Sequence, residues 1–445
     1  MRKDWFSCDG QGGNGLQAVD PPSTAWKPSP RDMTQSRRGF LVGLGLSSLA
    51  WAVPRTALSQ IAVDPKSARR GRNVVVSIFL RGGADGLNIV VPYAEDAYHR
   101  NRPALRLLEP GEGGKVDQVL DLDGFFGFNP ALADLLPRYK NGELAIVHAA
   151  GSGDQTRSHF EAMNTMERGL ASGSAGEASG WLARHLATSE PAKTSPLRAV
   201  AFGGTMPDSL RGATDAIAIN GLDDFKLITD DEPEMRAALK DLYGSGKDAM
   251  SQAGNETLQV LETLNRLDPK SYKPSNGSAY PKSDLGRALE QVALLIRAEV
   301  GLEVAVLDRG GWDTHVAQGV ATGLLSGNLL DLGSSLAAFA RDLGVEMSRV
   351  TVVVQTEFGR RLLENSGLGT DHGRASVMFV LGGGVRGGKV YTKWPGLEEP
   401  QLEPPGDLRV TTDYRQVLSD VLVRSFGSDP KNVFANFSPT PVGIF

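Results

Sequence analysis

Cysteine is nearly absent from this 445-residue chain, which contains a single one, Cys8. Because Cys8 precedes a predicted export signal, the mature protein would contain no cysteine. This absence excludes disulfide bonds, cysteine-ligated zinc, iron–sulfur clusters and a cysteine nucleophile. A metal site would have to use histidine, aspartate and glutamate side chains, and the chain has six histidines.

The chain also has no excess of positive charge. The chain has 47 lysines and arginines against 52 aspartates and glutamates, a formal net charge of −5, and no long basic run. Surfaces that bind nucleic acid or anionic membranes through charge show the opposite balance. We therefore expect neither as a partner.

Long hydrophobic runs are also lacking. The apolar run at 40–53 is shorter than the roughly 20 residues that span a membrane. It follows Arg37 and Arg38 in the sequence SRRGFL, which matches a twin-arginine signal peptide, and small residues offer cleavage at 50–52 or later, near 57 or 62. Met33 would start a signal of conventional length, so we interpret residues 1–62 as an N-terminal extension plus a signal peptide. We expect export by the twin-arginine machinery to the periplasm or the cell exterior, with no membrane anchor after cleavage.

The rest of the chain, residues 73–445, alternates apolar runs with amphipathic segments. Buried strands are predicted at 73–80, 143–148, 197–202, 302–307, 349–355 and 376–381. Helices are predicted at 130–139, 158–168, 233–243, 251–266, 285–300, 328–343 and 414–426. This alternation predicts an α/β domain with a mostly parallel sheet covered on both faces. Residues 204–282 have one short strand pattern, at 216–219, and are interpreted as a helical insertion or cap.

Acidic and histidine side chains follow several predicted strands, at the sheet edge where α/β proteins bind ligands. An aspartate in a glycine-rich loop also fits a simple turn, whereas histidines clustered with carboxylates favour a functional site. Together these oxygen and nitrogen donors suit zinc, manganese, magnesium or calcium. The candidate metal ligands are Asp85, Asp313, His315, Glu357, Asp371 and His372.

A second group of candidates lies in the segment TRSHFEAM at 156–163. Ser158 and Glu161 have the spacing of a capping box, so Ser158 can be explained as a helix N-cap. A hydroxyl at a helix N-terminus can also attack a phosphoryl or sulfuryl centre. Ser158, Thr156 and His159 are therefore candidate catalytic residues. Arg81, Arg360 and Arg374 are candidates for binding a substrate anion, although single arginines are usually solvated.

Five motifs carry a resemblance to a known family: FLRGGADGLN (79–88), TRSHFEAM (156–163), GGWDTH (310–315), TEFGR (356–360) and GTDHGRAS (369–376). The chain is similar to the exported "domain of unknown function 1501" family, which belongs to the alkaline phosphatase-like superfamily. The resemblance covers about 73–440, and its last segment is VTTDYRQVLSDVL (410–422). It implies a three-layer, doubly wound, mostly parallel α/β fold with a Ser or Thr nucleophile and up to two divalent cations.

The resemblance also assigns positions. Asp85 corresponds to the first metal-binding aspartate, and Ser158, or else Thr156, to the nucleophile. Asp313 and His315 correspond to a ligand pair, and Glu357 to the aspartate of an Asp-His step. In this register Phe358 replaces a histidine ligand, which departs from a two-metal pattern.

Two functions remain open at this point. The first is an exported, metal-dependent hydrolase of phosphate or sulfate esters, acting on a small-molecule or carbohydrate ester. The second is a non-catalytic periplasmic protein on a degenerate phosphatase fold, which binds carbohydrate or a protein partner in envelope assembly. A family resemblance alone does not decide between them.

Overall fold

The computed structural model describes residues 72–445 except 113, 115, 173–176, 190–194, 196, 224–226, 228, 230 and 247. All of these belong to one compact unit, 53–445. The twin-arginine motif, Met33 and the cleavage sites lie outside the described residues. None of the described helices is both long and apolar enough to cross a membrane.

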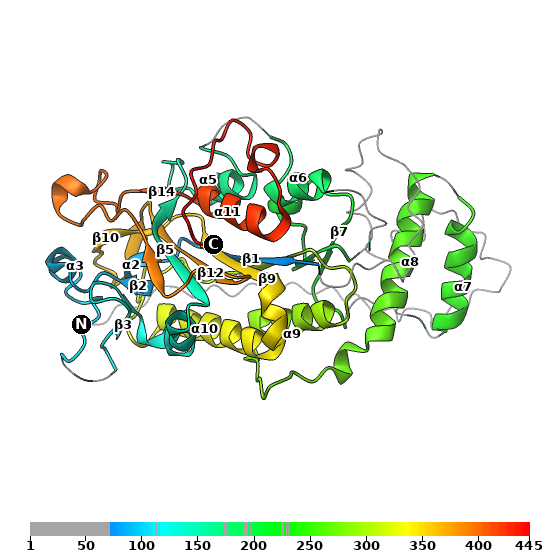
Figure 1. Ribbon diagram of the computed structural model, residues 1–445, viewed down its shortest axis with the longest axis horizontal. Helices are drawn as coiled ribbons and strands as arrows, with labels where there is room; N and C mark the ends of the chain where they lie inside the picture. The colour runs from blue at the N-terminus through cyan, green and yellow to red at the C-terminus, as the bar shows by residue number, and fades with distance from the viewer. Residues whose placement is uncertain are drawn as a thin grey trace, which may run out of the picture. The chain divides into compact units, whose positions relative to one another are not determined.

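A nine-stranded sheet forms the centre of this unit (Figure 1). Its strands run in the order β13-β5-β12-β9-β1-β8-β6-β7, and β14 pairs with β5. Their bounds are Val74–Leu80 (β1), Leu144–Gly151 (β5), Ala199–Phe202 (β6), Ala216–Ile219 (β7), Val304–Arg309 (β8), Val350–Thr356 (β9), Ser376–Gly382 (β12), Lys389–Tyr391 (β13) and Thr412–Asp413 (β14). The six strands predicted from apolar runs all occur here, because strands buried on both faces are apolar along their whole length.

The sheet is mixed rather than fully parallel. β12 runs antiparallel to both of its neighbours, β5 and β9, while the other pairs in this sheet are parallel. The start of β12 therefore lies at the same edge as the ends of β5 and β9.

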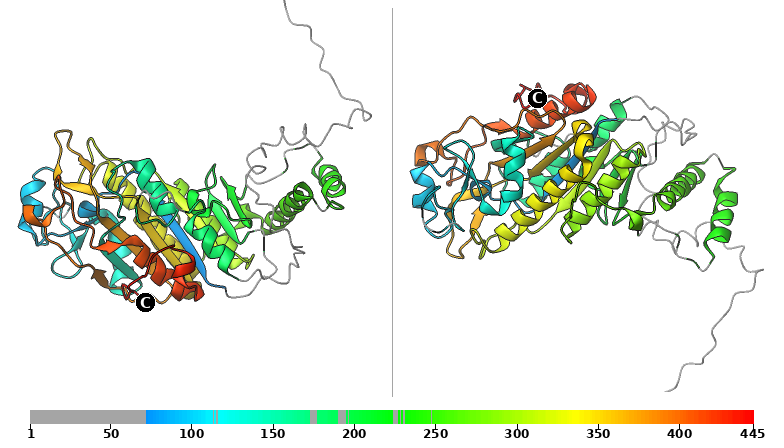
Figure 2. Two further views of the ribbon diagram at one scale, coloured as in Figure 1. Left: turned by 90° about the horizontal axis from the view of Figure 1, so that it is seen from above. Right: turned by 60° about the horizontal axis from the view of Figure 1, so that its bottom comes forward.

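Helices cover both faces of the sheet, as Figure 1 and the two views of Figure 2 show. Successive residues of β1 face opposite sides of the sheet. Val76 and Ile78 pack with α9 and α10 in one hydrophobic core. Val75 and Phe79 pack with α6 and α11 in the core on the other side. The helices are α2 (Gly86–Ile89), α3 (Asp96–Asn101), α4 (Leu136–Lys140), α5 (His159–Glu167), α6 (Trp181–Thr188), α7 (Glu232–Tyr243), α8 (Ala249–Leu267), α9 (Asp284–Arg297), α10 (Leu324–Leu343) and α11 (Tyr414–Phe426). This arrangement gives the three layers of an α/β fold.

Two small sheets lie outside the main one. β2 (Val90–Val91), β4 (Gly127–Phe128) and β3 (Leu120–Asp121) form one, and the antiparallel pair β10 (Arg360–Glu364) and β11 (Thr370–His372) forms the other. Short 3-10 turns complete the chain at Pro130–Leu135, Asp208–Leu210, Pro269–Ser271, Gly344–Arg349, Glu399–Gln401 and Pro430–Asn432. These small sheets were not predicted from the sequence, because strands of two to five residues are too short for a periodic pattern.

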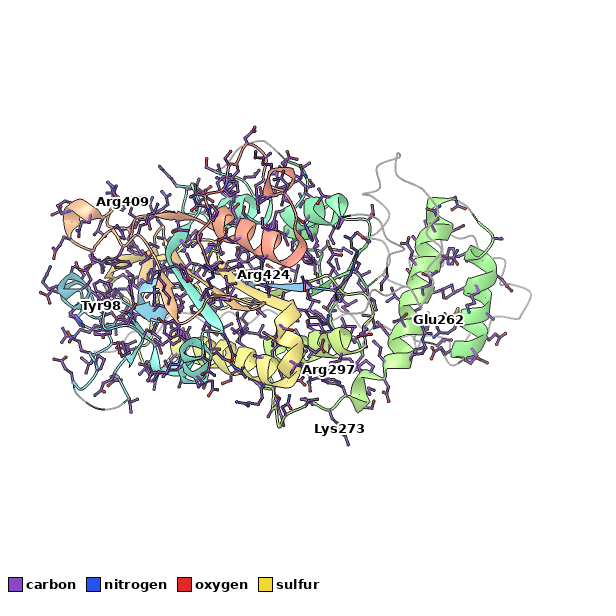
Figure 3. All side chains as sticks on the ribbon, in the orientation of Figure 1. Tyr98, Glu262, Lys273, Arg297, Arg409 and Arg424 are labelled. Carbon is purple, nitrogen blue, oxygen red and sulfur yellow. The ribbon has the colours of Figure 1, made fainter. Side chains whose placement is uncertain are left out.

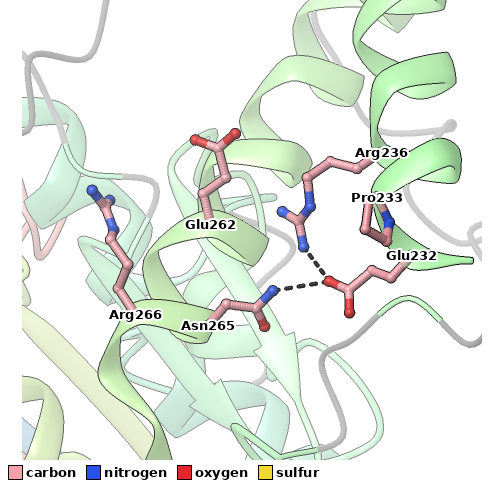
Figure 4. Close-up of a pocket in the computed structure, with 6 residues that line it drawn as sticks. All are labelled: Glu232, Pro233, Arg236, Glu262, Asn265 and Arg266. Carbon is pink, nitrogen blue, oxygen red and sulfur yellow. Dashed lines mark hydrogen bonds and ion pairs between the residues drawn. The ribbon is translucent and has the colours of Figure 1, made fainter.

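The range 204–282, predicted as a helical insertion or cap, supplies both sheet and helix. β7 extends the main sheet, and α7 packs against α8. Figure 4 shows the pocket between these two helices, where Glu232 accepts hydrogen bonds from Arg236 and Asn265. Its six lining residues include no histidine, aspartate, serine or threonine, so it offers neither imidazole metal ligands nor a hydroxyl nucleophile.

Candidate metal centre at the sheet edge

The carboxyl ends of four parallel strands bring the candidate residues to one edge. Leu80 at the end of β1 pairs with Thr356 of β9 and with Arg309 of β8. Ser376 at the start of β12 pairs with Ala150 near the end of β5. The loops that follow β1, β5, β8 and β9, and the segment that precedes β12, therefore meet at this edge.

Three side chains meet there closely enough to bind one cation. His159 is the first residue of α5, Asp313 follows β8, and His372 ends β11. One ligand atom from each lies within 4.8 Å of the other two. His315 adjoins them, with its Nε2 atom 3.1 Å from Asp313 Oδ1 and 2.8 Å from His372 Nε2. We call these four residues the His–Asp centre.

The outer ring nitrogen of each histidine faces an oxygen atom that can accept its proton. His159 Nδ1 lies 2.8 Å from Glu357 Oε1, and His372 Nδ1 lies 2.9 Å from the carbonyl oxygen of Arg157. His315 Nδ1 lies 3.4 Å from Asp371 Oδ1. Because these Nδ1 atoms donate, the neutral rings present their Nε2 lone pairs to the centre, as metal-binding histidines do.

One of these lone pairs has no hydrogen-bond partner. His159 Nε2 is buried without a hydrogen bond and lies 3.5 Å from Asp313 Oδ2. A buried polar atom without a partner is unfavourable, and a bound ion would remove this cost. The donor set therefore fits a divalent cation, and three imidazoles with one carboxylate favour zinc over magnesium or calcium.

Glu357 and Arg360 support the His–Asp centre through hydrogen bonds with His159 and Asp313. Glu357 Oε1 accepts a 2.8 Å hydrogen bond from the backbone N–H of Gly82 as well as the proton of His159 Nδ1. Arg360 is fully buried and donates to Asp313 Oδ1 at 2.6 Å and to the carbonyl oxygen of Gly83 at 2.6 Å. Glu357 is thus a positioning residue for His159, and Arg360 fixes the carboxylate of Asp313.

Phe358 forms an apolar wall between two of the imidazoles. Its ring centroid lies 4.9 Å from that of His159 and 4.8 Å from that of His372. A Cβ atom at Gly83, whose φ is +66°, would lie 2.4 Å from this ring. Glycine at this position therefore leaves room for the phenyl ring, in the position where the resemblance would place a histidine.

Hydrogen bonds set the protonation of the centre. Burial would raise the pKa of Asp313, but the hydrogen bond from Arg360 and the polar contact with His372 outweigh it and lower this pKa to about 2. The hydrogen bond with Glu357 raises the pKa of His159, whereas burial lowers the pKa of His372. The hydrogen bond from Asn365 is the main cause of a lowered pKa at Asp371. Both aspartates are ionised at neutral pH, as metal ligands and their supporting groups must be.

Asp85 lies outside the His–Asp centre. Its carboxylate forms a fully buried pair with Arg102, with nitrogen–oxygen distances of 2.6 and 2.9 Å, and accepts a 2.7 Å hydrogen bond from Gln318 Nε2. Gln318 Oε1 in turn accepts from Thr314 Oγ1 at 2.8 Å and Thr370 Oγ1 at 2.7 Å. Thr314 separates Asp313 from His315, so this buried network joins the two segments that carry the ligands.

Gln318 and Arg102 were not singled out in the sequence. Gln318 follows His315 by three positions in an irregular loop, and Arg102 directly follows the short helix α3. No sequence motif at either position predicts its contact with Asp85, because these contacts form between distant parts of the chain.

The two hydroxyl candidates have different surroundings. Thr156 Oγ1 donates to Asp154 Oδ1 at 2.6 Å and accepts from the backbone N–H of Ser158 at 3.2 Å, which closes the loop before α5. Ser158 is the N-cap residue by position, but its side chain makes no capping hydrogen bond. The hydrogen bond predicted for a capping box is therefore absent, and no hydrogen bond from the Ser158 hydroxyl to another residue in the described part of the chain is found.

The three arginines predicted to bind a substrate anion all have protein partners. Arg81 pairs with Glu167 at 3.1 Å and Asp308 at 2.8 Å. Arg374 pairs with Glu403 at 3.2 Å, and Arg360 holds Asp313 as described above.

Comparisons with known proteins identify a family. The chain belongs to the family described as "Protein of unknown function (DUF1501)", whose model matches residues 144–443. This confirms the family resemblance noted in the sequence. No curated protein sequence matches the chain.

Among solved structures, the chain is similar to the alkaline phosphatase of the Antarctic bacterium TAB5, at 10% identity and a TM-score of 0.28, over 70% of this chain and 92% of that one. A magnesium-bound mutant of that enzyme gives 9% identity and a TM-score of 0.28, over 70% and 91%. Scores this low assign neither a shared fold nor an activity.

Proposed function

We propose that this protein is an exported, metal-dependent hydrolase of phosphate or sulfate esters. The observation that supports it best is the convergence of three imidazole Nε2 atoms on the carboxylate of Asp313 at an accessible sheet edge. The side chains of Asp313 and His315 are 48% and 39% exposed, so a ligand can reach the centre from solvent. A purely structural site is normally closed by its ligands.

The chain's own residues have distinct roles in this proposal. His159, His315, His372 and Asp313 would hold the cation, with Glu357 and Arg360 positioning them. A bound divalent cation would stabilise negative charge on the ester and lower the pKa of a nearby hydroxyl or water.

Ser158 is the proposed nucleophile, because its hydroxyl has no capping bond whereas that of Thr156 is used within its loop. Its Oγ atom would bond to phosphorus or sulfur as the bond to the leaving alcohol breaks, and water would then release the phosphate or sulfate. The backbone N–H groups at the start of α5, together with the positive end of the helix dipole, favour an anion at this position.

Export is part of the same proposal. The twin-arginine motif at 36–41 supports delivery of the protein to the periplasm or the cell exterior in a folded state.

The first test is metal content, measured by inductively coupled plasma mass spectrometry on protein exported through its own signal. We expect about one equivalent of divalent metal in the wild type, and its loss in Asp313→Ala and His372→Ala. His99→Gln is the matched control, because His99 faces the carbonyl oxygen of Tyr93 and not the centre. A folded wild type that binds no metal would overturn the proposal.

The second test concerns turnover. Metal-loaded protein should hydrolyse a p-nitrophenyl ester of phosphate or sulfate, and Ser158→Ala should abolish this activity while retaining the metal. Thr156→Ala, which removes a hydroxyl used within its loop, should keep measurable activity. Metal binding without any ester turnover would instead favour a non-catalytic binding or envelope-assembly protein.

A further inference from the structure

Arg157 has an unusual backbone conformation directly before the first ligand of the His–Asp centre. Its φ angle is +55°, a conformation that residues other than glycine rarely adopt. Such a residue keeps this conformation only where its surroundings hold it. The carbonyl oxygen of Arg157 lies 2.9 Å from His372 Nδ1, and the residues that follow it are Ser158 and His159. The conformation of Arg157 therefore bears directly on the geometry of the centre.

Residues 404–407 anchor the guanidinium group of Arg157 outside its own loop. Its Nε atom donates to Asp407 Oδ2 at 2.8 Å, and its Nη2 atom donates to the same oxygen and, at 2.9 Å, to the carbonyl oxygen of Pro404. Charge-assisted hydrogen bonds of this kind are strong and directional. The side chain of Asp407 is fully buried, whereas that of Arg157 is 25% exposed. The buried carboxylate is therefore the fixed partner of this pair, and the position of Arg157 depends on it.

The segment that carries Asp407 is itself tied to the hairpin that carries His372. We call residues 402–410 the strap. Within it, the carbonyl oxygen of Gly406 accepts a 3.1 Å hydrogen bond from the backbone N–H of Leu362 on β10. β10 pairs with β11, which ends at His372. The strap thus holds Asp407 in a fixed relation to both the loop before α5 and the strand that supplies a metal ligand.

We propose that Asp407 is a positioning residue of the His–Asp centre and acts through Arg157. Its carboxylate holds the loop before α5 so that the carbonyl oxygen of Arg157 accepts the proton of His372 Nδ1. This acceptor keeps the proton on Nδ1, which leaves the Nε2 lone pair of His372 for a cation. The inference rests on the metal centre of the proposed function and does not depend on ester turnover.

Zinc affinity, measured by competition with a chromogenic chelator, tests this role. Asp407→Asn keeps the size of the side chain but removes the charge that holds Arg157. It should weaken zinc binding by roughly 10- to 100-fold, the usual effect of losing a group that supports a metal ligand. Arg157→Gln changes a partly exposed side chain instead of the buried carboxylate, and it should weaken zinc binding to the same extent.

The double variant separates a shared role from two independent ones. Because Asp407 acts through Arg157, the double variant should lose no more zinc affinity than either single variant. Losses that add up in the double variant would show that Asp407 acts by another route. Zinc affinity equal to that of the wild type in both folded single variants would overturn the inference.

Asp215→Asn is the matched control. Asp215 accepts a 2.6 Å hydrogen bond from Arg198 and directly precedes β7, which runs parallel to β6. It therefore lies at the opposite edge of the sheet from the centre. This variant also loses the charge of an Asp–Arg pair, so it should lower the unfolding temperature and leave zinc affinity unchanged. A loss of zinc affinity equal to that in Asp407→Asn would reduce the effect to general destabilisation.

A second measurement needs no bound metal and separates this inference from the proposed function. In metal-free protein with isotope-labelled histidines, nuclear magnetic resonance detects the Nδ1–H proton of His372, which is assigned by its absence in His372→Gln. This proton should exchange slowly with water in the wild type and in Asp215→Asn, because the carbonyl oxygen of Arg157 holds it. It should exchange faster in Asp407→Asn and in Arg157→Gln.

The two measurements together distinguish the possible failures. These exchange rates in a protein that binds no zinc would contradict the proposed function and retain the role of Asp407. Zinc binding by the wild type, with equal Nδ1–H exchange in the wild type and Asp407→Asn, would retain the metal centre and reject the role of Asp407.

Discussion

The Nε2 atoms of His315 and His372 lie 2.8 Å apart, and each ring has an oxygen acceptor at its Nδ1 atom. Two neutral rings held in this way direct lone pairs at each other, which is unfavourable unless a proton or a cation lies with them. Asp313 Oδ1, within 3.2 Å of both Nε2 atoms, adds negative charge at the same point. The His–Asp centre is thus most stable with a positive charge bound.

Metal removal should therefore lower the stability of the protein. A ligand that binds the native state at 100 times its dissociation constant stabilises it by about 2.7 kcal/mol. Differential scanning calorimetry should show a lower unfolding temperature after chelation and its recovery on adding zinc. His159→Ala should unfold at the same temperature with or without chelator, and a response of this variant equal to that of the wild type would contradict the assignment.

Replacement of Glu357 tests how the centre is supported. Glu357→Gln keeps the size of the side chain but removes the charge that holds His159 Nδ1. Loss of such a supporting group typically weakens metal affinity by about 10- to 100-fold. Competition with a chromogenic chelator should measure this change. Glu346→Gln is the control, because Glu346 pairs with Arg349 outside the centre, and it should leave the affinity unchanged.

Asp85 should be essential for stability rather than for binding metal directly. Asp85→Asn leaves Arg102 buried without its charged partner, which costs about 3–5 kcal/mol in comparable buried pairs. Chemical denaturation should detect this loss, and protein that still folds in the cold should retain its metal. Asp284→Asn removes half of an exposed pair with Arg287 and should cost less than about 1 kcal/mol. Loss of metal from folded Asp85→Asn would instead restore Asp85 as a ligand.

His148 should make the protein sensitive to mild acid. It is fully buried, its Nε2–H donates to the carbonyl oxygen of Val90, and its Nδ1 accepts from the backbone N–H of Ala149. Burial lowers its pKa from 6.5 to about 4. The stability that the neutral ring provides is therefore complete above about pH 6.5 and is lost as the pH falls through the folded-state pKa near 4.

Denaturation of the wild type and His148→Gln between pH 8 and pH 4 measures this contribution, since glutamine does not titrate. The difference in unfolding free energy between the two proteins should shrink by a few kcal/mol over this range, at about 1.4 kcal/mol for each unit of pKa shift. A difference that does not depend on pH would show that His148 does not titrate in the folded protein as expected.

The sequence predicted the layers and the edge of the sheet better than the connections between side chains. Apolar runs such as 73–80 and 349–355 predict strands because burial on both faces requires apolar residues throughout. The direction of a strand relative to its neighbours cannot be predicted in this way, because an apolar strand has the same composition whether it runs parallel or antiparallel. The reversal of β12 therefore could not be predicted from its residues.

The proximity of Asp313, His315 and His372 could be expected, because each adjoins a predicted strand. The position of His159 within the same group, and of Asp85 outside it, could not. The sequence around an aspartate that follows a strand does not show whether its carboxylate faces a metal or an arginine. For Asp85, the partner depends on where the 96–102 segment, which carries Arg102, packs. Tyr98, labelled in Figure 3, fixes that packing through its hydroxyl, which donates to Asn88 Oδ1 at 2.9 Å.

The reversed direction of β12 has a consequence for the order of events during synthesis. His159 leaves the ribosome more than 200 residues before His372, and His372 reaches the sheet edge only when β12 inserts between β5 and β9. A nascent chain without β12 could hold His159, Asp313, His315 and His372 but could not bring His372 to the sheet edge. Acquisition of metal would therefore be one of the last steps of folding, and a bound cation would mark a chain whose central sheet is complete.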